Sequence, residues 1–203
     1  MTARIDALIA GLSNPDANER NKALGELSRS GGAAVPSLTR ALGDPDVEVR
    51  AQAMMALAFI ADPASADTFA GLIGDADERI RANAANGLAQ LGDPRALDAL
   101  LATIDDYPAL SQYPSTLSTA GLIGLGTAAL PRVGQLLSSP RPMTRVRANY
   151  VLQNIVDAMP GEDWPTRWRN LGSYDPMGGD DAAREVAAVA WRSWIAALPG
   201  APG

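Results

Sequence analysis

Three pairs of adjacent carboxylates are the residues of this chain that come closest to acid–base chemistry. A two-carboxylate hydrolase holds its acid and base a fixed distance apart across a cleft, which neighbours in sequence do not provide. We therefore expect these acids to be helix N-terminal charges or solvated loop residues. The pairs are Asp105/Asp106, Glu162/Asp163 and Asp180/Asp181.

The rest of the composition narrows the chemistry further. The chain has no His and no Cys, which excludes Ser-His-Asp and Cys-His nucleophiles and disulfides, and leaves only carboxylates for a zinc ion. The sequence therefore predicts a protein that is not an enzyme, with no catalytic residue, no metal site and no cofactor.

The four tryptophans all follow Met159, in a segment that also contains a glycine-rich stretch. They are Trp164, Trp168, Trp191 and Trp194. Large aromatic side chains bury much area with few residues, so the simpler interpretation is a cluster that caps the end of the fold. The alternative interpretation is an aromatic ligand pocket.

A row of arginines recurs at one position of a repeated pattern. If Asn14, Asp44, Asp75 and Ser139 are helix N-caps, with Pro15, Pro45 and Pro140 at the first helical position, an Arg follows six residues later, an Ala nine later and a Leu thirteen later. The arginines are Arg20, Arg50, Arg81 and Arg145; the alanines are Ala23, Ala53, Ala84 and Ala148; the leucines are Leu27, Leu57, Leu88 and Leu152. A degenerate copy has Ser118 and Leu122 at the last two positions.

The arginine row has two possible roles. We expect the first three arginines to pair with an acid four residues earlier, namely Asp16, Asp46 and Asp77, in a ladder between repeats. Acids are scarcer near Arg132, Arg141, Arg145 and Arg147, so an anion or phosphate site there is the alternative.

A shorter apolar pattern with helical spacing precedes each capped segment, for example Val35, Leu38 and Leu42. Each repeat is therefore predicted to be two helices, and strand signals are absent. Successive leucines of the row are 30, 31, 34 and 30 residues apart, a period typical of a solenoid in which helical hairpins stack.

The segments AAVPSLTRALGDPDVEVRAQAMMALAFIAD and GDADERIRANAANGLAQLGDPRALDALLATI resemble HEAT repeats, in particular the short bacterial type called phycobilisome-lyase HEAT-like. The resemblance covers residues 1–158. It implies an all-α fold, a right-handed α-solenoid of about five to six hairpins, and a role in binding. Residues 159–203 are predicted to form a Trp-rich capping repeat continuous with the array.

The capped helices should present a polar stripe on the side away from the core, at positions four, eight, eleven and fifteen after the cap. In such solenoids the second helix lines the concave side, so we expect the stripe to bind a partner protein. Met55, Phe59 and Tyr150 interrupt its polarity, as partner anchors do. The predicted contact residues are Glu48, Gln52, Met55, Phe59, Arg79, Asn83, Asn86, Gln90, Arg147, Tyr150 and Asn154.

A longer connection, Asp105 to Pro114, departs from the repeat pattern. It is expected to be an insertion of the kind that solenoids tolerate on one face. The alternative is a loop that contacts the partner through Tyr107 and Tyr113.

Charge and hydropathy indicate which partners and which compartment to expect. Residues 1–106 hold 16 acidic and 9 basic side chains and residues 107–203 hold 7 and 8, which argues against attraction to nucleic acid or anionic lipid. No apolar run is long enough for a membrane span, and the first residues do not read as a signal peptide. We therefore expect a cytoplasmic protein, whose oligomeric state the sequence does not give.

Three functions remain open at this point. The leading hypothesis is a scaffold or adaptor that captures a segment of another protein in its concave groove. The resemblance also implies, as an alternative, a chromophore-lyase-like or ligand-chaperone subunit. A DNA glycosylase of the HEAT-like kind is the third, and the acidic balance disfavours it.

Overall fold

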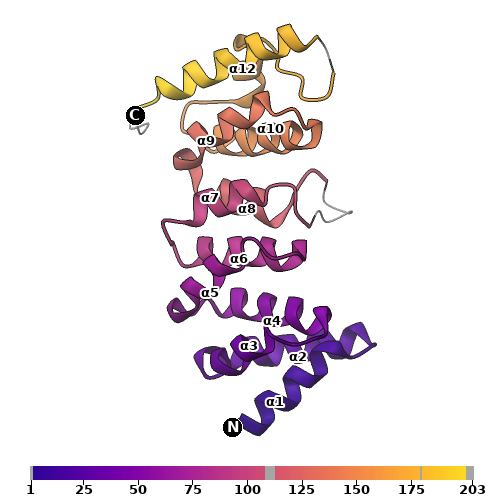
Figure 1. Cartoon of the computed structure of the whole chain (residues 1–203). Coiled ribbons are helices and arrows are strands. Elements are labelled where there is room, and N and C mark those ends of the chain that lie inside the picture. The colour runs from indigo at the N-terminus through magenta and orange to yellow at the C-terminus, as the bar shows by residue number, and fades with distance from the viewer. Residues whose placement is uncertain (1, 108–112, 179, 200–203) are drawn as a thin grey trace. The chain divides into compact units, whose positions relative to one another are not determined.

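A computed structural model describes residues 2–107, 113–178 and 180–199. The fold is all-α, of the α-solenoid class, and contains no strand within these ranges. Its twelve α-helices follow one another as six pairs, each with a short helix before a longer one (Figure 1). The pairs are α1 (Thr2–Ala10) and α2 (Ala17–Ser30), α3 (Val35–Ala41) and α4 (Val47–Ile60), α5 (Ala66–Gly71) and α6 (Glu78–Gln90), α7 (Ala96–Ala102) and α8 (Leu117–Gly124), α9 (Leu130–Gln135) and α10 (Pro142–Asp157), and α11 (Trp164–Asn170) and α12 (Asp181–Ala196).

The chain forms two compact units, Met1–Ala99 and Leu100–Gly203. In unit 1, α4 packs between α2 and α6 and also against its own short partner α3. In unit 2, α10 packs against α8 and α9, and α12 packs against α9. The division of the chain at residue 158 stays a prediction.

Small residues in the long helices allow close packing within each unit. The four alanines of the repeated pattern are at most 6% exposed, and the five leucines are fully buried. The degenerate copy is accommodated because the buried hydroxyl of Ser118 lies 2.8 Å from that of Thr103, which satisfies both groups. The predicted alanine and leucine positions are therefore confirmed as core.

Glycine extends this close packing at one helix contact. A Cβ at Gly87 of α6 would lie 2.6 to 2.8 Å from ring atoms of Phe69. Phe69 is fully buried on α5. The absence of a side chain at position 87 therefore lets α5 and α6 approach each other.

The predicted helix N-caps are two residues too early. Each long helix of unit 1 begins after a second aspartate, whose carboxylate accepts from the backbone N–H two residues on; these N-caps are Asp16, Asp46 and Asp77. Asn14, Asp44 and Asp75 instead accept from the backbone N–H of those aspartates, at 2.8 to 2.9 Å. The pattern Asp-x-Asp thus forms a side-chain-capped turn followed directly by a capped helix.

The arginine row closes these turns. In five of the six repeats, Nη1 of an arginine donates to the backbone carbonyl six residues earlier, at 2.7 to 3.1 Å, as in Arg50 to Asp44. The five arginines are Arg20, Arg50, Arg81, Arg145 and, in the last repeat, Arg184. The expected ladder through Asp16 and Asp46 is therefore wrong, because those carboxylates serve as N-caps.

Within the described ranges, every helix is too short or too polar to cross a lipid bilayer.

Candidate partner-binding surface

Helix α4 has one exposed stripe. Seven of its side chains are buried, among them Ala53, Met54 and Leu57. The predicted positions Glu48, Gln52 and Met55 are half-buried, and Phe59 is 64% exposed. Because these residues are three or four apart, they lie on one side of the helix, as the sequence predicts.

Helix α6 continues this surface beside α4. Arg79 Nη1 donates to Glu48 Oε2 at 2.6 Å, so the two helices are in register with an offset of 31 residues. Since both long helices run in the same direction, the same offset places Asn86 beside Met55 and Gln90 beside Phe59. Glu48, Gln52, Met55, Phe59, Arg79, Asn86 and Gln90 are called the α4–α6 face below.

One end of the α4–α6 face is a hydrogen-bonded charge network. Glu48 accepts from Arg79 and from Gln52 Nε2, and Arg79 also donates to Asp77. The hydrogen bond from Arg79 is the main cause that lowers the pKa of Glu48 and of Asp77. Arg20 of the preceding repeat lies 4.0 Å from Glu48. These interactions hold the side chains of Glu48 and Arg79 in place. The other end of the α4–α6 face, with Phe59 and Gln90, is therefore the part that is free to contact a partner.

Asn83 does not belong to the exposed surface. Its side chain is 3% exposed and donates to the carbonyl of Arg79 one turn earlier. The amides of Asn86 and Gln90, in contrast, have no hydrogen-bond partner among the described residues, and Gln90 is exposed.

In unit 2, Arg147 is also buried. It is 5% exposed and donates to Asp105 at 2.6 Å. Tyr150 and Asn154 are half-buried on the same helix, and Asn154 donates to the carbonyl of Tyr150. The predicted stripe on α10 is therefore reduced to Tyr150 and Asn154.

The two loop tyrosines are exposed. Tyr107 is 37% and Tyr113 62% exposed, and the Tyr113 hydroxyl lies 3.7 Å from Sδ of Met143. Residues 108–112 between them lie outside the described residues.

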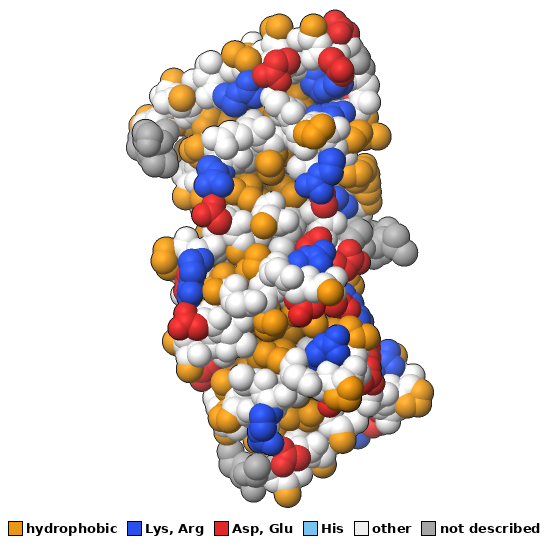
Figure 2. Space-filling model, viewed as in Figure 1, with side chains coloured by type: hydrophobic (Ala, Val, Ile, Leu, Met, Phe, Trp, Pro, Cys, Tyr) orange, Lys and Arg blue, Asp and Glu red, His pale blue; other side chains and the backbone are white. Residues whose placement is uncertain are grey.

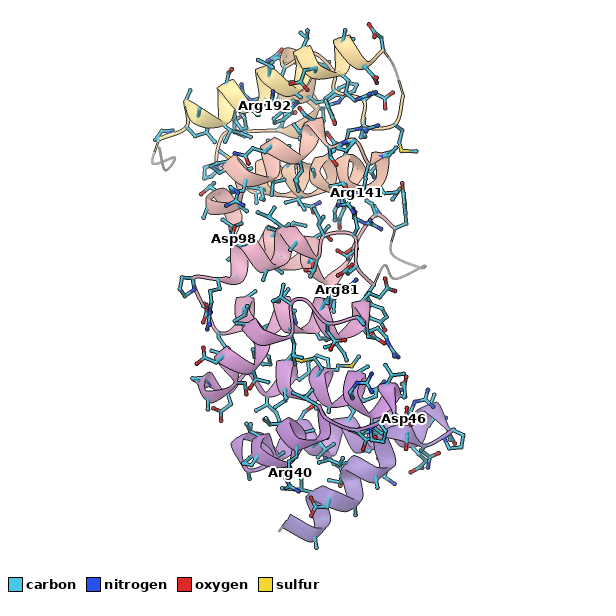
Figure 3. All side chains as sticks on the ribbon, viewed as in Figure 1. Arg40, Asp46, Arg81, Asp98, Arg141 and Arg192 are labelled. Atoms are coloured by element: carbon cyan, nitrogen blue, oxygen red, sulfur yellow. The ribbon has the colours of Figure 1, made fainter. Side chains whose placement is uncertain are left out.

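The arginines considered for an anion site already have partners. Asp105 accepts from Thr144 and Arg147 and pairs with Arg141 at 3.1 Å, at the start of α10 (Arg141 is labelled in Figure 3). Arg145 donates to the carbonyls of Ser139, Pro140 and Pro176, and Arg132 also has an interaction partner. The spacing of residues in the sequence does not identify Asp105 as the acid of this group, because Asp105 lies 36 to 42 residues before Arg141, Arg145 and Arg147.

The acids of the other two adjacent pairs stand at helix starts, in agreement with the expected placement of such acids at helix N-termini. Asp163 and Asp180 are the N-caps of α11 and α12. Glu162 binds Arg167, and Asp181 pairs with Arg184. Within the described ranges no group of three or more acids is arranged to hold a metal ion.

Three of the four tryptophans form a packed cluster, and the fourth, Trp168, donates its indole N–H to the carbonyl of Tyr174 at 2.9 Å. Trp191 is fully buried; its ring stacks on Trp164 at 4.9 Å and meets Trp194 edge-on at 5.5 Å. The Arg167 guanidinium lies over the Trp194 ring at 4.6 Å. Two hollows described in unit 2, of about 430 and 170 Å³, have no tryptophan in their walls. This packing supports the interpretation of the cluster as a cap.

On each unit, acidic and basic side chains of the described residues are interspersed on the side that Figure 2 shows. Such interspersed charge is the opposite of the basic patch that phosphate backbones require.

Comparison with known proteins agrees with the observed repeats. The family model for HEAT repeats matches residues 5–75 and 35–111, which together cover more than half of the chain. None of the curated proteins matches significantly.

Among solved structures, the complex of CpcE and CpcF of phycocyanin lyase from Nostoc sp. PCC7120 is 23% identical, with a TM-score of 0.44; the match covers 94% of this chain and 99% of that one. A designed armadillo repeat protein in complex with the peptide (KR)4 is 17% identical, with a TM-score of 0.45 and coverage of 92% and 99%. An engineered protein is 18% identical, with a TM-score of 0.43 and coverage of 95% and 96%.

Proposed function

This chain belongs to the HEAT-repeat family, and we propose that it is a non-enzymatic adaptor whose α4–α6 face binds an extended segment of another protein. Phe59 carries the proposal. The Phe59 side chain is 64% exposed. Beyond the first turn of α4, all other large apolar side chains of this helix are buried or half-buried. A phenyl ring left in water beside polar neighbours is typical of an interface anchor, since burying it on binding is favourable.

The amides beside Phe59 favour an extended partner over a helical one. Each primary amide offers both donors and an acceptor, and those of Asn86 and Gln90 have no partner among the described residues. An extended segment exposes backbone N–H and C=O groups that such amides can bind, whereas a helix has already paired its own.

Charge favours a neutral or basic segment. Residues 1–99 carry 14 acidic and 9 basic side chains, so unit 1 attracts cationic chains and repels anionic ones. The Glu48–Arg79 pair at one end of the face is neutral as a whole and sets the limit of the binding surface. We also propose Tyr150, Asn154, Tyr107 and Tyr113 as contact residues on unit 2.

The proposal is tested by selecting peptides from a random display library on the immobilised protein and measuring their affinity for two variants. Phe59→Ala should weaken the selected peptides at least about tenfold, as expected for a hot-spot aromatic. Val47→Ala, at an apolar position of α4 that is 39% exposed but outside the stripe, is the matched control and should bind normally. If the selected peptides bind both variants with equal affinity, and the thermal unfolding of the helices is unchanged, the proposal is wrong.

A further inference from the structure

The outward side of the last helix, α12, is apolar and unpaired. Val186 is 71% and Val189 47% exposed, and the helical spacing aligns them with Ala182, Ser193 and Ala196, which are also exposed. These five residues are called the α12 outer face. The opposite side, with Ala187, Ala188, Trp191 and Ile195, is buried.

A helix side that faces water in a repeat array is normally polar. The α12 outer face has no charged residue at any of its five positions. An outer face without charge that exposes two neighbouring valines therefore marks an interaction surface.

The charges along one flank of this face indicate what covers it. Glu185 and Arg192 lie next to the face on the same side of α12, where they pair with each other at 2.6 Å (Arg192 is labelled in Figure 3). The Ser138 hydroxyl donates to Glu185 and accepts from Arg192, and both charged side chains remain accessible, since they are 50% and 31% exposed. The midpoint between them falls between Ala188 and Val189, close to the centre of the α12 outer face, whose end residues are Ala182 and Ala196.

We propose that the α12 outer face binds the same face of a second copy of this chain, with the two helices antiparallel about a two-fold axis near Val189. About such an axis, each flank of α12 lies beside the same flank of the second copy. It places Glu185 of each copy beside Arg192 of the other, so that four charges alternate in sign along one edge. The second flank carries only Ala183, Ala190 and Ala197, whose small side chains permit close approach of the helices. The antiparallel arrangement also sets the positive N-terminal end of each helix dipole near the negative C-terminal end of the other.

The contact is small. A helix of 16 residues is about 24 Å long at 1.5 Å per residue, so one helix pair buries less than a standard protein interface. We therefore expect a weak dimer that forms in the micromolar range.

Sedimentation velocity over a range of concentrations from about 10 to about 500 µM tests the association, because dimerisation depends on concentration. The unaltered chain should shift from monomer to dimer. Val189→Glu, which would bring two carboxylates together at the axis, should remain monomeric. Met177→Glu is the control, since Met177 is 61% exposed in the same unit but lies outside α12; it should dimerise normally. A monomer at all concentrations, or equal dimerisation of both variants, overturns the proposal.

Cysteine cross-linking tests the orientation in a chain that has no cysteine of its own. Val189→Cys should form a disulfide-linked dimer under mild oxidation, because a disulfide needs the two Cβ atoms about 4 Å apart. Ala182→Cys alone should not cross-link, since the two copies of that position would be about 21 Å apart. A mixture of Ala182→Cys and Ala196→Cys chains should give the mixed dimer. Efficient linkage of Ala182→Cys with itself would overturn the antiparallel arrangement.

Discussion

Arg147 Nη1 donates a 2.6 Å hydrogen bond to Oδ1 of Asp105, 42 residues earlier in the chain. The other carboxylate oxygen of Asp105 accepts from Thr144 at 2.5 Å and lies 3.1 Å from Arg141. One acid at the end of α7 therefore holds the first two turns of α10. This arrangement compensates the charge of an arginine that is almost entirely buried.

Replacing Asp105 by Ala should destabilise unit 2 by about 3 to 5 kcal/mol, because Arg147 would keep its buried charge without a partner. Urea denaturation followed by circular dichroism measures this loss. The comparison is Asp67→Ala, which removes a surface pair with Arg95 whose carboxylate is 96% exposed; it should cost less than about 1 kcal/mol. Similar losses for the two variants would contradict the structural role of Asp105.

The contact of Gly87 with Phe69 predicts an overpacking effect. Gly87→Ala should destabilise unit 1 by about 1 to 3 kcal/mol, since the new methyl group would overlap the ring. Phe69→Leu should restore part of this loss in the double variant. Gly71→Ala is the control: a Cβ there meets no atom within 4 Å, so its effect should be neutral or stabilising by up to about 1 kcal/mol. Thermal melts of the unaltered chain, Gly87→Ala, the double variant and Gly71→Ala measure these differences in stability.

The turn arginines should be stabilising through their hydrogen bonds to the backbone. Arg50→Met removes the donor to the carbonyls of Asp44 and Pro45 and should cost about 1 to 3 kcal/mol. Arg29→Met, at an exposed position of the last turn of α2, should change stability by no more than about 0.5 kcal/mol. Urea midpoints compare the two, and equal midpoints would show that the turn does not need the arginine.

Acid should weaken unit 1 through Glu48 and Asp77. Hydrogen bonds from Arg79 lower the pKa of both carboxyl groups in the folded state. Their stabilising effect is therefore complete above the unfolded pKa values of about 4, and it is lost as the pH falls through the lower folded values.

Arg79→Gln removes the main cause of these lowered pKa values. The loss of stability between about pH 5 and about pH 3 should then be smaller than in the unaltered chain. Arg40→Gln is the control, because Arg40 hydrogen-bonds Ser37 and pairs with no carboxylate among the described residues. Urea midpoints across this pH range measure the difference, and parallel acid profiles for all three proteins would refute the assignment.

The helical repeats were predictable because their signals are local and recur. An Ala and a Leu four residues apart, as at Ala53 and Leu57, identify the buried side of each long helix without any knowledge of its neighbours. The start of each helix was predicted two residues too early because the segment Asp44-Pro45-Asp46 offers two residues of cap type. Proline fits after the first, and only the backbone shows that the second is the N-cap.

The composition of the exposed face was harder to predict. Asn83 and Arg147 have the same spacing as the exposed positions, but each is covered by packing and hydrogen-bonded to a partner that the spacing does not reveal. The valines of α12 had a signal, since Ala182, Val186 and Val189 are four and three residues apart on the side away from Trp191. That second apolar stripe on one helix could have been found from the sequence.

Because Arg20, Arg50, Arg81, Arg145 and Arg184 each bond to the carbonyl six residues earlier in their own repeat, these five corners of the chain are each closed by a bond within a single repeat. Whole repeats of this protein can therefore be duplicated or excised in an engineered chain with their corners intact, and only the apolar contacts between adjacent layers would have to be rematched.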